Sequence, residues 1–242
     1  MKKTLDLNLS GKDALIITDI QLDFLPGGAL PIKEGDQIVP ILNDYTKLFA
    51  NAKTKIVASR DWHPENHVSF EAQGGPWPPH CVQGSAGAKF SSNLKLPKDV
   101  TVISKATNPS KEAYSVFDDT GLEVQLKTAG VTRIFIGGLA TDYCIVNSVL
   151  DARKAGYQVV VLSDATRGID VKPGDVEKAF RTMRSAGAAQ VTLSDFPDPE
   201  DLIGLESPAE IEGDKPLGES DVKKKARMRP RGSYKQVRRE RG

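Results

Sequence analysis

Residues 14–19 read Ala-Leu-Ile-Ile-Thr-Asp, a short run of apolar and β-branched side chains that ends in a carboxylate. Similar runs recur along the chain, and each has the length of a strand. They are residues 55–61, 100–105, 133–138, 158–164 and 189–194. Because apolar side chains follow one another with little alternation, both faces of each strand should be covered, as they are in a parallel sheet.

Helical patterns separate these runs, at residues 36–51, 142–156 and 174–187. Strands that alternate with helices are typical of a parallel sheet covered by helices on both faces. The sequence therefore predicts an α/β protein with three layers, α/β/α, around a six-stranded, mainly parallel sheet.

In sheets of this kind the functional site forms where the strands end, at their carboxyl edge. Asp19, Asp61 and Lys105 each end a predicted strand, and a glycine turn at Gly138 ends the fourth. We therefore expect these four positions to be neighbours in the folded protein, although they lie far apart in the sequence.

The composition excludes several classes of protein. Of 242 residues 39% are hydrophobic and 27% charged, which is ordinary for a globular domain. No apolar run approaches the roughly 18 residues of a membrane span, and the first residues lack the apolar core of a signal peptide. Two cysteines, Cys81 and Cys144, cannot form a disulfide framework, so we expect a cytoplasmic protein without membrane contact.

Charge divides the chain into three parts, although its formal net charge is only +1. Residues 1–197, the predicted domain, are neutral, residues 198–220 carry −7, and residues 221–242 carry +8. Both charged segments hold few large apolar residues, so we predict a disordered acidic linker and a disordered basic tail. Two interpretations of the tail remain open: an arm that contacts the phosphates of a nucleic acid, or a solvated extension.

All three histidines of the chain, His63, His67 and His80, lie within one eighteen-residue window, and Asp61 precedes the first by two residues. Imidazole and carboxylate groups gathered in this way are the ligands that a divalent metal such as zinc requires. The alternative is that these histidines are surface or capping residues near a turn. Both interpretations stay open at this point.

Residues 137–146 lead from a predicted strand through two glycines into a helix, and they place Cys144 in its first turn, with Thr141 as the N-cap. The free N–H groups and positive end of a helix stabilise a thiolate and can also bind an oxyanion. This position favours a nucleophile over an inert buried cysteine. Cys81 has no such placement, and we interpret it as structural.

A cysteine nucleophile needs a base and a balancing charge. If the histidines bind a metal, Asp19 is the candidate base, because a carboxylate at the end of an apolar strand can have a raised pKa. Lys105 can supply the positive charge. Each has a plainer alternative, a turn cap for Asp19 and a solvent-directed chain for Lys105, but three such residues at neighbouring strand ends favour catalysis.

These residues resemble the Asp/Lys/Cys triad of the isochorismatase-like cysteine hydrolases, over about residues 11–196. Within that superfamily, a second pair of motifs resembles the nicotinamidases, whose metal is held by an Asp-x-His pair and a later histidine. The pair is Arg-Asp-Trp-His-Pro at residues 60–64 and Trp-Pro-Pro-His-Cys at residues 77–81. Two independent sets of motifs in the expected order make the likeness specific.

The resemblance implies hydrolysis of nicotinamide to nicotinate and ammonia in NAD salvage, with pyrazinamide as a further substrate. Cys144 would attack the carboxamide carbon and form a thioester, Asp19 would move the proton, and Lys105 would balance the charge. The N–H groups of Ala140 and Cys144 would bind the oxyanion, beside a cis peptide between Leu139 and Ala140.

The resemblance also implies a metal, Zn²⁺ with Fe²⁺ or Mn²⁺ as alternatives, that anchors the pyridine nitrogen. Its ligands would be Asp61, His63 and His80. His67 would support the ligands without binding the ion.

The walls of the implied pocket are aromatic: Phe24, Trp77 and Tyr114. Two other functions remain open: a related cysteine hydrolase that acts on another small amide, and a non-catalytic metal- or nucleic-acid-binding protein on the same fold. Assembly into a homo-oligomer is compatible with the sequence, which does not decide it.

Overall fold

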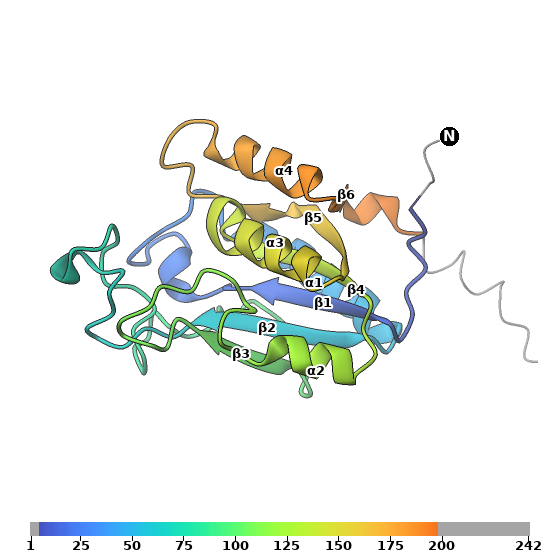
Figure 1. Cartoon of the computed structure of the whole chain (residues 1–242), viewed down its shortest axis with the longest axis horizontal. Helices are drawn as coiled ribbons and strands as arrows, with labels where there is room; N and C mark the ends of the chain where they lie inside the picture. The colour runs from blue at the N-terminus through green and yellow to red at the C-terminus, as the bar shows by residue number, and fades with distance from the viewer. Residues whose placement is uncertain (1–4, 198–242) are drawn as a thin grey trace, which may run out of the picture. The chain divides into compact units, whose positions relative to one another are not determined.

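The computed structural model describes residues 5–197, and a six-stranded sheet runs through their centre (Figure 1). The strands stand in the order β3-β2-β1-β4-β5-β6, and every neighbouring pair is parallel. They are β1 (Asp13–Thr18), β2 (Lys55–Asp61), β3 (Thr101–Lys105), β4 (Arg133–Leu139), β5 (Gln158–Arg167) and β6 (Ala189–Val191). The predicted fold class and parallel sheet are confirmed.

The register of the sheet brings the predicted site residues to one edge. Thr18, the last residue of β1, pairs with Ser59 of β2 and with Gly138 of β4. On the next strand pair, Asp61 stands opposite Lys105. The residue after Thr18 is Asp19, so the positions that end the predicted strands are neighbours at the carboxyl edge, as expected.

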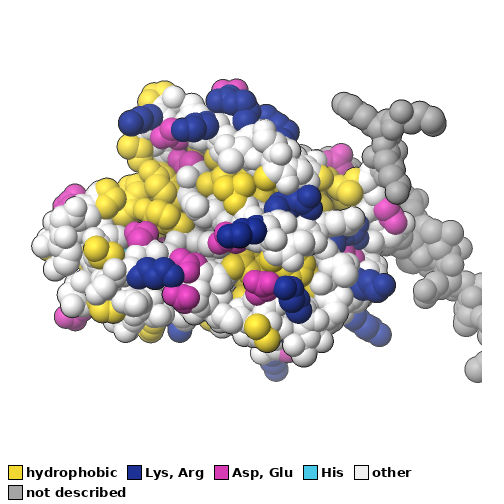
Figure 2. Space-filling view, in the orientation of Figure 1, with side chains coloured by type: hydrophobic (Ala, Val, Ile, Leu, Met, Phe, Trp, Pro, Cys, Tyr) yellow, Lys and Arg dark blue, Asp and Glu magenta, His cyan; other side chains and the backbone are white. Residues whose placement is uncertain are grey.

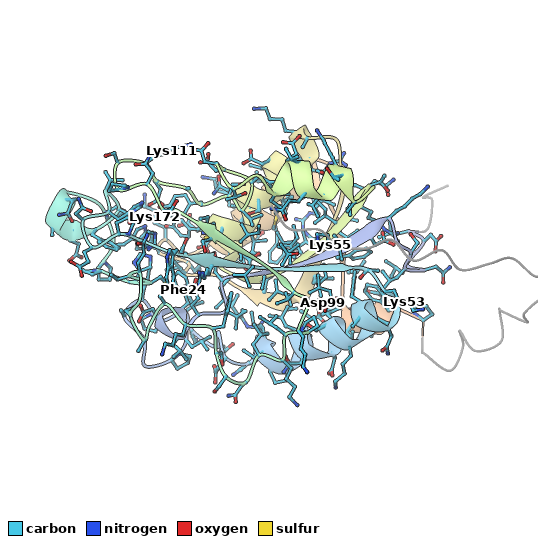
Figure 3. All side chains as sticks on the ribbon, turned by 90° about the horizontal axis from the view of Figure 1, so that it is seen from below. Phe24, Lys53, Lys55, Asp99, Lys111 and Lys172 are labelled. Carbon is cyan, nitrogen blue, oxygen red and sulfur yellow. The ribbon has the colours of Figure 1, made fainter. Side chains whose placement is uncertain are left out.

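Side chains of the sheet alternate between two cores, one on each face. In β1, Leu15 and Ile17 pack into the core with α1, whereas Ala14 and Ile16 pack into the core with the other helices. Figure 3 shows α1 on one side of the sheet and α2 on the other. The helices are α1 (Ile38–Asn51), α2 (Leu122–Thr128), α3 (Val146–Lys154) and α4 (Asp175–Ser185). This is the predicted three-layer arrangement.

Three elements differ from the prediction, and the first two are helix α2 and the last strand. Helix α2 was not expected, because it is short and buries only Leu122 and Leu126, while Val124 is 69% exposed, so its apolar pattern is weak. The last predicted strand, residues 189–194, ends at Val191, because the chain then turns into a short 3₁₀ helix that begins with a capping box between Thr192 and Asp195.

The helix after β4 begins differently from the prediction. A π-helical turn, Thr141–Ile145, precedes α3. Thr141 is not its N-cap: Ala140 occupies that position, and no side chain caps the turn. The hydroxyl of Thr141 is instead buried 2.7 Å from the hydroxyl of Thr166 on β5. That hydrogen bond ties the turn to the sheet.

The acidic linker, residues 198–220, and the basic tail, residues 221–242, lie outside the described residues. Their disorder and the tail's contact with nucleic acid stay predictions. Among the residues that the structure describes, no helix is long and apolar enough to cross a membrane.

We expect the substitution Phe49→Ala to lower the free energy of unfolding by roughly 3–5 kcal/mol, because the substitution removes a fully buried ring and leaves a cavity. The ring of Phe49 lies edge-on to Phe135 and Phe196, with centroids 4.9 and 6.2 Å away. The control, Val124→Ala on the exposed face of α2, should change it by at most about 0.5 kcal/mol. Urea unfolding measures both, and equal small effects would contradict this packing.

Candidate active site

Three side chains that were predicted to act together meet at the carboxyl edge of the sheet, on the left of Figure 1. Lys105 Nζ lies 3.0 Å from Asp19 Oδ2 and 3.2 Å from Cys144 Sγ. Their exposed fractions are 1%, 0% and 5%, so the interactions are shielded from water. A base, a cation and a thiol are therefore in direct contact.

Lys105 reaches this position by spanning a strand. It ends β3, whereas Asp19 follows β1, and β2 lies between them. The register pairs Lys105 with Asp61, and the ammonium donates a hydrogen bond to the carboxylate of Asp61 on the way. One ammonium thus connects the nucleophile to the histidine window.

Lys105 stays protonated although its side chain is completely buried. Burial alone would lower its pKa, but the carboxylates of Asp19 and Asp61 hold that pKa above its ordinary value. For Asp61, burial opposes the charge, yet Lys105 and the neighbouring histidines keep the pKa of its carboxyl below the ordinary value. Both groups are therefore ionised at neutral pH.

Asp19 has an unusual pKa and an unusual backbone conformation. Burial raises the pKa of Asp19 to about 6, although Lys105 opposes the shift. One carboxylate oxygen, Oδ1, accepts a hydrogen bond from the Ser59 hydroxyl at 2.7 Å. Its backbone has φ of +55°, a left-handed conformation that aspartate tolerates better than most residues. A carboxylate with a pKa of this size can both take up and release a proton near neutrality.

Cys144 is a thiol at neutral pH. Burial raises the pKa of the thiol well above its ordinary value, and although Lys105 opposes this, Asp19 adds to it. Deprotonation must therefore accompany the reaction.

The turn before Cys144 needs glycine at Gly138. Its φ is +122°, and a Cβ there would lie 2.1 Å from the carbonyl oxygen of Thr18. The peptide between Leu139 and Ala140 is cis, as the family resemblance implied. The turn places Ala140 and Cys144 in the wall of one pocket.

Asp61, His63 and His80 form a cluster whose ligating atoms all lie within 4.8 Å of one another. The Nδ1 of His63 donates to the carbonyl of His80 at 3.0 Å, and the Nδ1 of His80 donates to the carbonyl of Pro78 at 2.8 Å. Because a carbonyl only accepts, each ring keeps its Nε2 lone pair free, which is how histidines are oriented for a metal. Burial also lowers the pKa of His63 to about 4, so its ring is neutral. The donor set fits a divalent metal.

His67 lies beside this cluster, with its ring centroid 4.4 Å from that of His63. Both of its nitrogens already have protein partners: Nε2 donates to the carbonyl of Lys111 at 3.1 Å, and Nδ1 accepts from the hydroxyl of Ser69 at 2.7 Å. The ring is therefore placed to support His63. All three histidines are buried, and none reaches the face shown in Figure 2.

The predicted aromatic residues line the same pocket as Cys144 and the metal cluster. Phe24 packs against His80 with centroids 5.5 Å apart, and the indole N–H of Trp77 donates to the hydroxyl of Tyr114 at 3.1 Å. The space between the walls is about 20 Å³, little more than one water molecule needs.

Four further residues line the pocket and were missed by the sequence analysis: Leu30, Glu112, Tyr143 and Ile169. Of these, only Tyr143 could have been found from the sequence, because it immediately precedes Cys144. The centroid of its ring lies 5.1 Å from that of Trp77. The others come from irregular segments. A larger hollow of about 520 Å³, lined by Lys53, Lys55 and Asp99, lies at the far end of the sheet from Phe24 (Figure 3) and holds none of these groups.

Comparison with known proteins shows similarity to one family of hydrolases. The family model described as "Isochorismatase domain" matches residues 13–195. The chain is 38% identical over 204 residues to a nicotinamidase of Escherichia coli, covering 76% of this chain and 96% of the relative.

Two solved structures are similar in fold and sequence. The pyrazinamidase of Pyrococcus horikoshii in complex with zinc is 51% identical, with a TM-score of 0.72, covering 75% of this chain and 99% of that one. PnC1 from L. infantum in complex with nicotinate is 38% identical, with a TM-score of 0.74, covering 80% and 99%.

We expect His80→Ala to lose bound zinc after dialysis, because it removes one of three clustered donors. His67→Gln should still bind one zinc ion, because both nitrogens of His67 are held by Ser69 and Lys111 and its ring only packs against that of His63. Elemental analysis of the dialysed proteins gives the stoichiometry, and a chelator competition gives the affinity. Complete loss of zinc in His67→Gln would show instead that His67 is a ligand.

Proposed function

The chain belongs to the isochorismatase family, and from this premise we propose that it is a nicotinamidase, a hydrolase that cleaves the carboxamide C–N bond of nicotinamide. One observation carries the proposal: the ammonium of Lys105 contacts Asp19, Cys144 and Asp61 together. A thiol nucleophile with its base is thus joined to a metal-ligand cluster in one pocket, where a small aromatic amide can be held and attacked.

In the first step, Sγ of Cys144 forms a bond to the carboxamide carbon while its proton passes to Asp19. The carboxylate is ionised at neutral pH because its pKa is about 6. The negative charge that develops on the amide oxygen is taken up by the N–H groups of Ala140 and Cys144. Lys105 keeps the positive charge that balances Asp19 throughout.

In the second step, Asp19 returns the proton to the amide nitrogen, the C–N bond breaks, and ammonia leaves behind a thioester on Cys144. Water then adds to the thioester carbon and gives its proton to Asp19. Collapse of this intermediate breaks the C–S bond and returns the proton of Asp19 to the sulfur, and the nicotinic acid released loses its own proton to solvent as nicotinate. One carboxylate thus serves as acid and base in turn.

Asp61, His63 and His80 would hold the metal, which supplies a Lewis-acid contact for the ring nitrogen of the substrate when bound. The donor set and the zinc complex of the Pyrococcus relative support Zn²⁺, with Fe²⁺ or Mn²⁺ as alternatives. The chain's own aromatic residues then confine the ring: Phe24, Trp77, Tyr114 and Tyr143. The pyrazinamidase relative supports pyrazinamide as a second substrate.

We also propose a place in NAD salvage, in keeping with the nicotinamidase relative. We also propose that the enzyme acts in the cytoplasm, in keeping with its unpaired cysteines. A related amidase acting on another small amide would use the same triad, so the rate of ammonia release from nicotinamide must be compared with that from other amides.

Cys144→Ala should lower the rate of ammonia release from nicotinamide by roughly 10⁴-fold or more, because no other group in the pocket can form the thioester. Asp19→Asn should cause a loss of similar size, since it removes the proton acceptor. Zinc content and thermal unfolding of Cys144→Ala should match those of the wild type. If that variant, correctly folded, keeps more than a tenth of the activity, the chain does not use this mechanism.

The value of kcat/KM should fall below about pH 6, by roughly tenfold per pH unit, because protonated Asp19 cannot accept the thiol proton. Above that pH the carboxylate is ionised and the acid limb should level off. Zinc content measured at each pH is the control, since protonated histidines release metal. An acid limb that follows zinc loss instead of Asp19 would contradict this assignment.

A further inference from the structure

The six residues that follow β1, residues 19–24, touch both halves of the site. We call this segment the β1 strap. It begins with the base Asp19 and ends with Phe24, whose ring packs on His80. Between them, Gln21 and Asp23 each bond to the backbone at or beside a metal ligand. Neither residue takes part in the mechanism above.

Gln21 is fully buried and clamps Asp61 on both sides. Its Oε1 accepts the N–H of Asp61 at 2.7 Å, and its Nε2 donates to the carbonyl of Asp61 at 2.8 Å. The same Nε2 also donates to the carbonyl of Ala88 at 2.9 Å. Because both backbone groups of Asp61 are held, the direction in which its carboxylate leaves the chain is set by Gln21.

Asp23 acts on the other end of the metal cluster. Its Oδ2 accepts the N–H of Cys81, the residue after His80, at 2.7 Å. The backbone of Cys81 has φ of +47°, a left-handed conformation that residues other than glycine rarely adopt. The hydrogen bond from Cys81 to the carboxylate of Asp23 helps to hold the backbone in this conformation. Gly87 closes over this contact, since a Cβ at that position would lie 2.1 Å from the carboxylate of Asp23.

We propose that Gln21 and Asp23 are positioning residues, which set the geometry of the metal ligands Asp61 and His80 relative to the base Asp19. The inference rests on the proposed function in one respect, that the metal anchors the substrate. Its physical reason is that supporting hydrogen bonds fix the orientation of ligands and commonly change metal affinity by roughly 10–100-fold.

The strap also connects the base to the metal cluster. Asp19, Gln21 and Asp23 are alternate residues of one short segment, whereas the ligands lie about 40 to 60 residues further along the chain. A movement of Asp61 would break its buried hydrogen bonds to Gln21, and a movement of the backbone beside His80 would break the partly buried hydrogen bond from Cys81 to Asp23. The strap therefore transmits the position of Asp19 to both ends of the cluster.

The test compares zinc affinity in Asp23→Ala and Asp23→Asn, measured by competition with a chromophoric chelator. Asp23→Ala should bind zinc roughly 10–100-fold more weakly. Asp23→Asn keeps an oxygen acceptor for the N–H of Cys81 and should stay within a few-fold of the wild type. At saturating zinc, Asp23→Ala should raise KM for nicotinamide more than it lowers kcat, because the triad is untouched.

Asn43→Ala is the matched control. The amide of Asn43 clamps a loop in the same manner, donating to the carbonyl of Asn93 at 2.9 Å and accepting the N–H of Lys95 at 2.8 Å, with no metal ligand among its partners. It should lower the unfolding temperature and leave zinc affinity unchanged. Gln21→Glu, which keeps the acceptor and loses both donors, provides a second variant of the strap.

Unchanged zinc affinity in both Asp23→Ala and Gln21→Glu would overturn the proposal, as would an equal loss of affinity in Asn43→Ala. The visible absorption of the cobalt-substituted proteins gives an independent readout, since it reports ligand geometry without turnover. If the strap variants lose zinc while the wild type releases no ammonia from nicotinamide, the positioning role stands and the proposed function fails.

Discussion

The buried ammonium of Lys105 is the interaction on which the site depends. A charge taken out of water is costly unless it is paired, and Lys105 is only 1% exposed. Its partners Asp19 and Asp61 would in turn repel each other without it, because their carboxylates lie within 4.8 Å of one another. Each of the three charges therefore needs the other two, and together they fix the base, the thiol and the first metal ligand in one arrangement.

This arrangement needs a parallel sheet. All strands point the same way, so their last residues gather at one edge, and β2 supplies a carboxylate halfway between β3 and β1. An antiparallel neighbour would send Asp61 or Lys105 to the opposite edge. The uninterrupted apolar strands do more than form the core, because they determine which polar residues can meet.

For that reason much of the site could be predicted from the sequence. Apolar runs that end in Asp19, Asp61 and Lys105 identified three strand ends, and a strand end in a parallel sheet has a known location. The glycine turn before Cys144 was equally informative, since Gly138 has no room for a side chain beside Thr18. Each of these patterns is local in the sequence, and the parallel sheet then brings the residues that carry them together.

Other parts could not be predicted, for physical reasons. Leu30, Glu112 and Ile169 reach the pocket from irregular segments, whose paths leave no periodic pattern. The raised pKa of Cys144 could not be predicted either, because it results from burial and from the nearby Asp19, which depend on tertiary packing. The roles of Gln21 and Asp23 likewise depend on partners about 40 and 58 residues away.

The opposing effects on Asp19 and Cys144 decide how the proton moves. Burial raises the pKa of both groups, but Lys105 restrains the pKa of Asp19 to about 6, while the pKa of the Cys144 thiol lies well above its ordinary value. A free thiolate at rest is therefore a minor species. Transfer becomes favourable only as the sulfur gains a bond to the carboxamide carbon and ceases to be basic. A base of this strength is then strong enough to accept the proton during attack, and weak enough to release it to departing ammonia.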